Sequence, residues 1–126
     1  MHYSRVLLID DDEDDQRFIL MAIKEIGASV ECVTLDDARS ALTQLENGAV
    51  VADVIFLDLN MPMMTGQQFL SELNKRKSLS QIPVIVLSSC ANIETINATM
   101  ALGATIFITK PGNFKDLKIV LQKILE

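Results

Sequence analysis

The stretch Val54-Ile-Phe-Leu-Asp58-Leu-Asn-Met-Pro-Met-Met-Thr-Gly66 decides the fold of this chain. Four apolar residues lead directly into Asp58, and Pro62 and Gly66 then interrupt the run. A short apolar run of this kind predicts a strand that is buried on both faces. Ligands bind beyond the carboxyl ends of strands in open α/β sheets, so Asp58 is a candidate site residue. By itself, however, an aspartate in this position is as often a turn former or a helix cap.

Strand-like and helix-like segments alternate on both sides of this stretch. The apolar patterns predict strands at 5–9, 30–33, 54–57, 84–87 and 105–109. Helices are predicted at 14–26, from a cap at Asp36 or Asp37 to Asn47, at 66–77, at 92–102 and at 113–125. In the first of these helices, the residues expected on the inner face are Phe18, Ala22, Ile23 and Ile26. Alternation with short connections predicts a doubly wound, five-stranded parallel sheet covered by five helices.

Composition excludes several classes of protein. The 126 residues fit one domain, so we expect a single domain over 1–126 without an output domain. The net charge of −6 argues against nucleic acid as a direct partner. No apolar run approaches the ~20 residues that span a bilayer, and the N-terminus lacks a signal-peptide pattern. Because Cys32 and Cys90 match no metal or redox spacing, we expect a reduced, cytoplasmic protein.

Six consecutive acids follow the first predicted strand. Asp10 and Asp11 come directly after Ile9, and the strands 5–9 and 54–57 are expected to be neighbours. Asp10, Asp11 and Asp58 should therefore share one pocket, where their charges repel unless they are neutralised. Mg²⁺ suits such a site because it prefers oxygen ligands. The next four acids, 12–15, are predicted to form the solvated start of the following helix, where the helix dipole favours them.

Two further polar residues end predicted strands. Ser88 follows the strand 84–87, and Lys110 follows the strand 105–109. Alone, the serine is a common turn residue and the lysine a common solvated one. Beside a pocket of carboxylates, however, a lysine can pair with an anionic oxygen. The combination of acids, hydroxyl and lysine at separate strand ends is far more specific than any one of them.

These motifs resemble the two-component response-regulator receiver domain, in its single-domain form seen in the bacterial chemotaxis regulator. The resemblance runs from Val6 to about Leu125 and rests on Leu8-Ile-Asp-Asp11, Phe56-Leu-Asp-Leu-Asn-Met-Pro62 with Gly66, Pro83-Val-Ile-Val-Leu-Ser88, Gly103-Ala104 and Thr109-Lys-Pro111. The resemblance implies a flavodoxin-like fold, in which the five strands follow the order 2-1-3-4-5 across the sheet.

The resemblance also implies a role for each site residue. Asp58 is expected to be the phosphoacceptor, Asp11 a direct Mg²⁺ ligand, Asp10 a ligand mainly through water, and Asn60 a ligand through its backbone carbonyl. Lys110 is expected to contact the phosphoryl group, and the Lys110–Pro111 bond to be cis. Ser88 takes the position of the switch hydroxyl. Phe107 takes that of the switch aromatic, without the hydroxyl of a tyrosine.

The implied function is a phosphorylation-dependent signalling switch rather than an enzyme. A sensor histidine kinase or a histidine phosphotransfer protein would donate the phosphoryl group to Asp58. Movement of Ser88 and Phe107 would then alter the outer face formed by 92–102, 105–109 and 113–125, which would bind an unknown downstream protein. Ile119 is expected to point outward from the last helix, as a contact with a partner or with a second copy in a homodimer.

Three other functions fit the residues less well. A haloacid-dehalogenase-like phosphohydrolase also forms an aspartyl phosphate, but it has a second aspartate where this chain has Asn60, and no cap domain is evident. A flavodoxin-like small-molecule binder needs a phosphate-binding loop after the first strand, and here that loop is acidic and free of glycine. A DNA-binding regulator needs an output domain or a basic face, and neither is evident.

Overall fold

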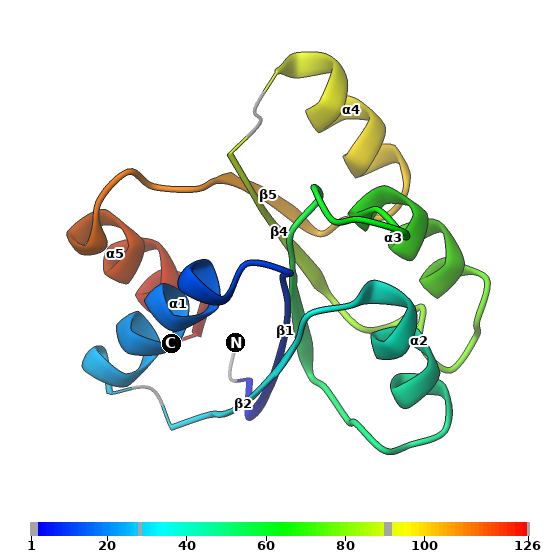
Figure 1. Ribbon diagram of the computed structural model, residues 1–126, viewed down its shortest axis with the longest axis horizontal. Helices are drawn as coiled ribbons and strands as arrows, with labels where there is room; N and C mark the ends of the chain where they lie inside the picture. The colour runs from blue at the N-terminus through cyan, green and yellow to red at the C-terminus, as the bar shows by residue number, and fades with distance from the viewer. Residues whose placement is uncertain (1–2, 28, 90–91, 126) are drawn as a thin grey trace.

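The computed structural model describes residues 3–27, 29–89 and 92–125, so Cys90 lies outside the described residues. Strands and helices alternate along the chain (Figure 1): β1 (Arg5–Ile9), α1 (Glu13–Glu25), β2 (Glu31–Leu35), α2 (Ala38–Glu46), β3 (Val54–Leu57), α3 (Gly66–Asn74), β4 (Val84–Ser88), α4 (Ile93–Ala101), β5 (Ile106–Thr109) and α5 (Phe114–Leu125). Among the described residues, no helix combines the length and apolar character needed to cross a bilayer.

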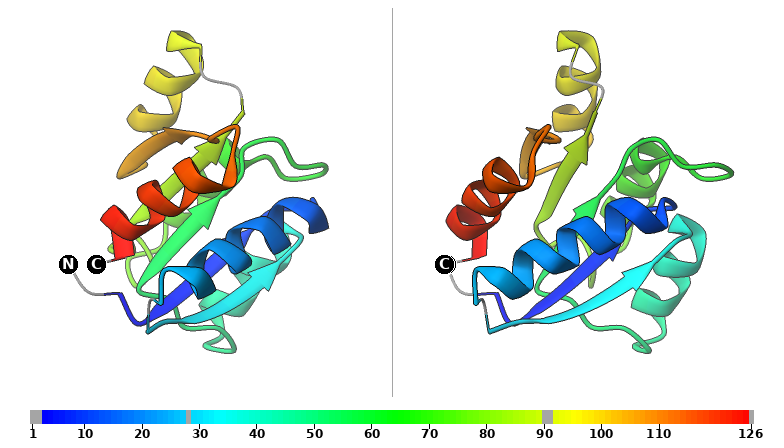
Figure 2. Two further views of the ribbon diagram at one scale, coloured as in Figure 1. Left: turned by 90° about the vertical axis from the view of Figure 1, so that its left-hand side faces the viewer. Right: turned by 60° about the vertical axis from the view of Figure 1, so that its left-hand side comes forward.

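The five strands form one parallel sheet in the order β2-β1-β3-β4-β5. This confirms the predicted topology, and β3 lies at its centre. Figures 1 and 2 show α1 and α5 together on one face of the sheet and α2, α3 and α4 on the other. All strands point the same way, so their carboxyl ends meet along one edge.

The sheet separates two apolar cores because successive side chains of a strand point to opposite faces. Leu7 and Leu57 pack on the side of α2 and α3, whereas Leu8 and Phe56 pack on the side of α1 and α5. All four residues of β3 are fully buried, as expected of a central strand covered on both faces. This burial fixes the point at which the chain leaves the sheet at Asp58.

Most inward helix faces agree with the predicted patterns, but that of α1 is rotated slightly. Ala22 and Ile23 are buried as expected, and Ile19, which the prediction omitted, is buried with them. Phe18 was expected to face the core, yet it is 36% exposed. Its ring lies 5.2 Å from that of Phe114, centroid to centroid, because α1 packs side by side with α5 and Phe18 covers that junction.

Candidate functional site

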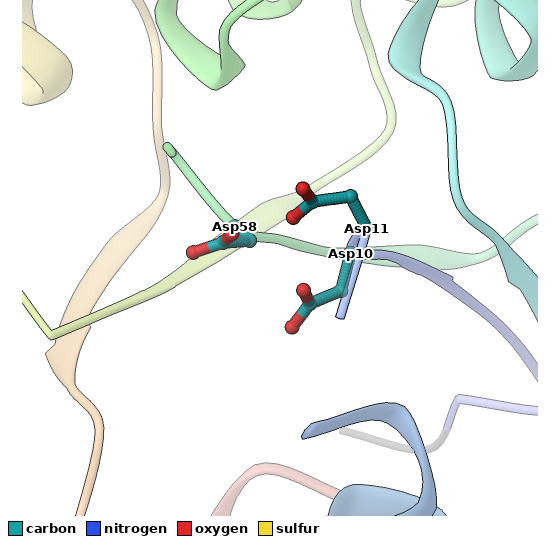
Figure 3. A group of neighbouring side chains, drawn as sticks. All are labelled: Asp10, Asp11 and Asp58. Atoms are coloured by element: carbon teal, nitrogen blue, oxygen red, sulfur yellow. The ribbon is translucent and has the colours of Figure 1, made fainter. Parts of the chain in front are cut away.

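Three aspartates gather where β1 and β3 leave the sheet. The backbone N–H of Asp58 donates to Ile9 O at 3.0 Å, which carries the pairing of the two strands to their last residues. The carboxylates of Asp10, Asp11 and Asp58 each offer an oxygen within 4.8 Å of the others. Figure 3 shows the three side chains reaching from the ends of β1 and β3 into the same space. The prediction that they share one pocket is therefore confirmed.

Burial makes the ionised form of two of these carboxylates energetically unfavourable. Asp10 is 1% exposed and Asp58 is 7% exposed, whereas Asp11 is exposed. Burial raises the pKa of Asp10 to about 6, although the Asp12 N–H and the charge of Lys110 act to lower it. Burial likewise raises the pKa of Asp58, against the lowering effects of Lys110 and of the Asn60 backbone hydrogen bond. A bound cation would stabilise the ionised forms of these two buried carboxylates and so lower their pKa values.

Lys110 brings one positive charge to the cluster. It follows β5, and its Nζ lies 3.4 Å from Asp10 Oδ2 and 3.5 Å from Asp58 Oδ1. Burial alone would lower the pKa of this lysine, but the hydrogen bond to Asp15 and the charges of Asp58 and Asp10 outweigh burial and raise it. Lys110 therefore stays charged at any physiological pH, as a lysine that holds an anionic oxygen must.

Asp15 also belongs to this cluster, which sequence reasoning missed. Its Oδ2 accepts a hydrogen bond from Lys110 Nζ at 2.8 Å, the shortest of the three ion pairs of that lysine. The prediction of a solvated helix start holds for Asp12, whose side chain caps α1, and for Asp14. Asp15 also lies in the first turn with a partly exposed side chain, but the prediction missed its ion pair with Lys110. Because α1 begins shortly after β1, its first turn lies over the site, and Asp15 is the third residue of that helix.

The expectation of a cis Lys110–Pro111 bond is wrong for this structure, in which the bond is trans. A trans bond is favoured by about 0.5–1 kcal/mol even before proline. The backbone around Lys110 is nevertheless well fixed, since its N–H donates to Ser88 O at 2.9 Å. The ends of β4 and β5 are thus tied together at two of the predicted site residues.

Ser88 and Phe107 lie on neighbouring strands, as predicted. Ser88 is the last residue of β4 and is fully buried. It borders a cavity of about 180 Å³ on the side of α3 and α4, lined also by Leu59, Asn60, Thr65, Gln67 and Thr95. Phe107 is paired in register with Val86 and is partly buried against the α2 and α3 core.

The close packing around residue 66 explains why a glycine stands there, after β3. A Cβ on Gly66 would lie 2.5 Å from the backbone oxygen of Asp58 and 2.8 Å from Leu59 Cα. Helix α3 begins at this residue with a capping box in which Thr65 and Gln68 satisfy each other's backbone N–H groups. The start of α3 therefore packs directly on the backbone that carries Asp58 and holds that residue at the strand end.

Large apolar side chains are exposed on α4, β5 and α5. Ile119 is 44% exposed, which confirms its predicted outward direction, although its contact role stays a prediction. Sequence reasoning did not single out its exposed companions on the other two elements, which are Ile93, Met100 and Ile106. Scattered apolar residues are common on protein surfaces, so exposure alone does not identify a partner.

Comparison with known proteins gives a consistent match. The family model described as "Response regulator receiver domain" matches residues 6–122. Response regulator Rcp1 of Synechocystis sp. is 30% identical over 124 residues, which cover 94% of this chain and 84% of Rcp1. Two-component response regulator ORR1 of Oryza sativa is 36% identical over 121 residues, or 91% of this chain and 52% of ORR1.

Solved structures agree with the sequence matches. The phosphorylated cyanobacterial phytochrome response regulator RcpA is 31% identical, with a TM-score of 0.88 over 98% of this chain and 91% of RcpA. The Mn²⁺-bound form of Rcp1 is 29% identical, with a TM-score of 0.85 over 96% of this chain and 91% of that protein. Chemotaxis protein CheY4 of Vibrio cholerae is 30% identical, with a TM-score of 0.79 over 97% and 98% of the two chains.

Proposed function

Since the chain belongs to the response-regulator receiver family of two-component signalling switches, we propose that Asp58 accepts a phosphoryl group from a histidine kinase or a histidine phosphotransfer protein. The observation that carries this proposal is the position of Asp58. It ends the central strand, shares a pocket with Asp10 and Asp11, and has the ammonium of Lys110 at 3.5 Å. The phosphorylated RcpA and Mn²⁺-bound Rcp1 structures support the same chemistry in relatives.

A divalent cation fits the three-aspartate cluster. All of its donors are carboxylate oxygens, which hard cations such as Mg²⁺ prefer, and its buried charges are only partly balanced by Lys110. We propose that Asp10, Asp11, Asp58 and the backbone carbonyl of Asn60 hold Mg²⁺. When bound, the ion would supply positive charge that neutralises the transferred phosphoryl group and the carboxylates around it.

The transfer itself needs a nucleophile and a held phosphoryl group. A carboxylate oxygen of Asp58 forms a bond to phosphorus while the bond from phosphorus to the donor's histidine nitrogen breaks, and the electron pair of that bond leaves on the nitrogen. The product is an acyl phosphate. Lys110 donates to a phosphoryl oxygen and so stabilises the charge that moves with the group. The positive charge of Lys110 also favours the ionised, nucleophilic form of Asp58.

Phosphorylation is proposed to act on the face formed by α4, β5 and α5. A phosphoryl oxygen on Asp58 gives the hydroxyl of Ser88 a charged acceptor, and Ser88 would move toward Asp58 to meet it. The cavity that Ser88 borders leaves space beside the end of β4 for this movement. Phe107, next to β4 in the sheet, would then move inward. The altered face would bind a downstream protein or a second copy of the chain. A coupling of about 1–3 kcal/mol is enough for such a switch.

Intact-mass measurement after incubation with acetyl phosphate and Mg²⁺ tests the proposal. The parent protein should gain one phosphoryl group that hydroxylamine removes. Asp58→Asn should gain none, whereas Asp14→Asn should be labelled like the parent because the side chain of Asp14 is 93% exposed and paired with Arg17. Full labelling of Asp58→Asn would show that another residue is the acceptor, and no labelling of the parent would refute the proposed activity.

A further inference from the structure

Lys110 is shared by three carboxylates that differ in distance and in exposure. Asp15 is nearest at 2.8 Å, whereas Asp10 and Asp58 lie at 3.4 and 3.5 Å. The side chain of Asp15 is 44% exposed, but those of Asp10 and Asp58 are 1% and 9% exposed. The best partner of the lysine is thus also the one that water can reach.

The position of Asp15 is fixed by the start of α1. The side chain of Asp12 caps the helix and accepts hydrogen bonds from the N–H groups of Asp14 and Asp15 at 2.9 and 3.1 Å. The N–H of Asp12 in turn donates to Asp10 Oδ1 at 3.0 Å. These hydrogen bonds fix the backbone of Asp15 in the first turn of α1, from which its carboxylate reaches Lys110 Nζ.

Solvation decides which carboxylate can release the lysine. A buried carboxylate that loses its cationic partner pays a large desolvation cost, whereas an exposed one is stabilised by water. Asp15 can therefore give up Lys110 at small cost, and Asp10 cannot. A phosphoryl group on Asp58 would carry up to two negative charges and would compete for the same ammonium.

We propose that Asp15 is a positioning residue that holds the ammonium of Lys110 over the first turn of α1 in the unphosphorylated protein and releases it to a phosphoryl group on Asp58. The proposal rests on the proposed function, because it assumes that Lys110 contacts the phosphoryl group. Asp15 thereby lowers the affinity of the pocket for a phosphoryl group and makes the unmodified state the default. The carboxylate competes as an ion partner and takes no part in the bond changes.

Beryllofluoride with Mg²⁺, a stable mimic of the phosphoryl group, provides the test. Asp15→Asn should bind the mimic about fivefold more tightly than the parent, the size expected for a partly exposed ion pair. Asp14→Asn removes the same charge from the same helical turn, but Asp14 contacts Arg17 instead of Lys110. It should stay within about twofold of the parent, since it reports only the general effect of net charge. Asp15→Glu keeps the charge and should return toward the parent affinity.

A double-mutant cycle separates this role from a structural one. In a Lys110→Met background, Asp15→Asn should no longer change the affinity for the mimic, because the contact that it removes is already lost. The ¹⁵N signal of the Lys110 ammonium should also move in Asp15→Asn and not in Asp14→Asn. This signal can be followed in the parent on addition of the mimic, so the inference remains testable if one variant folds poorly.

The outcomes distinguish the inference from the proposed function. If the parent neither binds the mimic nor accepts a phosphoryl group, the proposed function fails. If the parent binds it while Asp15→Asn and Asp14→Asn match each other, the role of Asp15 is wrong and the proposed function stands. Weaker binding by Asp15→Asn would also overturn the inference, because the carboxylate would then orient Lys110 for the phosphoryl group.

Discussion

The side-chain amide of Gln67 on α3 donates a hydrogen bond to the hydroxyl of Thr99 on α4 at 3.1 Å. Thr99 is the one buried residue of α4, all of which is described, and its hydroxyl donates in turn to Thr95 O at 2.7 Å. Ile93 and Met100 of the same helix are exposed. A hydrogen bond to α3 therefore accompanies the packing of α4, and apolar burial contributes less than in the other helices.

Thr99→Val should lower the free energy of unfolding by about 1 kcal/mol, since it keeps the shape of the side chain and leaves the Gln67 amide without this acceptor. Urea denaturation measures the change. Thr43 offers a matched control, because it is exposed and its hydroxyl bonds only to Arg39 O one turn earlier. Thr43→Val should stay within about 0.5 kcal/mol of the parent. Equal losses in the two variants would mean that the link between α3 and α4 adds no stability.

Mg²⁺ should stabilise the unphosphorylated protein, because it relieves repulsion among Asp10, Asp11 and Asp58. At ten times Kd the gain should be about 1.4 kcal/mol by linkage. Asp11→Asn should reduce this gain strongly, whereas Asp14→Asn should preserve it. Thermal melting with and without Mg²⁺ measures both. A common response of the two variants would contradict the assignment of Asp11 to the cluster and of Asp14 to solvent.

The raised pKa of Asp10 predicts how stability depends on pH when a chelator removes divalent cations. The folded protein holds this proton up to about pH 6, whereas the unfolded chain loses it near the ordinary aspartate pKa of 3.8. Between these values the folded state binds more protons, so stability falls as the pH rises. The loss should total about 3 kcal/mol, from roughly two units at ~1.4 kcal/mol each.

Asp10→Asn tests this contribution, because it removes the carboxyl group whose pKa is raised while the acids outside the cluster titrate alike in parent and variant. The variant should gain stability relative to the parent as the pH rises from about 4 to 6, with little further change above that range. Urea denaturation across the range, with chelator present, gives the difference. Parallel curves for the two proteins would mean that Asp10 titrates at its ordinary pKa.

Ser88→Ala tests the switch and leaves the transfer intact. The variant should still be phosphorylated on Asp58, since Lys110 and the carboxylates remain, but it loses the contact that differs between the two states. In the parent, beryllofluoride should change hydrogen-exchange protection across 92–109, and in Ser88→Ala that change should shrink while the mimic still binds. An undiminished response would make Ser88 a simple strand-end residue and place the switch elsewhere.

Most of the fold could be read from the sequence, because the apolar patterns and the breaks between them are local. The apolar run Val54–Leu57 forms a buried strand, so Asp58 must lie where that strand ends. Because β1 is parallel to β3, Asp10 and Asp11 lie at the same edge of the sheet. The family motifs placed Ser88 at the end of β4 and Lys110 directly after β5, whereas Phe107 lies one residue into β5 and pairs with Val86. Residue type and strand period were sufficient to place Asp58, Ser88 and Lys110, whereas Phe107 was singled out only by the family resemblance.

Other features depended on how the elements pack against one another. Asp15 pairs with Lys110 across 95 residues of sequence, and this contact exists only because α1 starts over the ends of the strands. Phe18 covers the junction with α5 because the two helices lie side by side. The amphipathic period of α1 describes one helix in isolation and contains neither the position of α5 nor that of Lys110. The sequence by itself thus determined the strands and the residues at their ends, whereas tertiary packing decided which charges meet there.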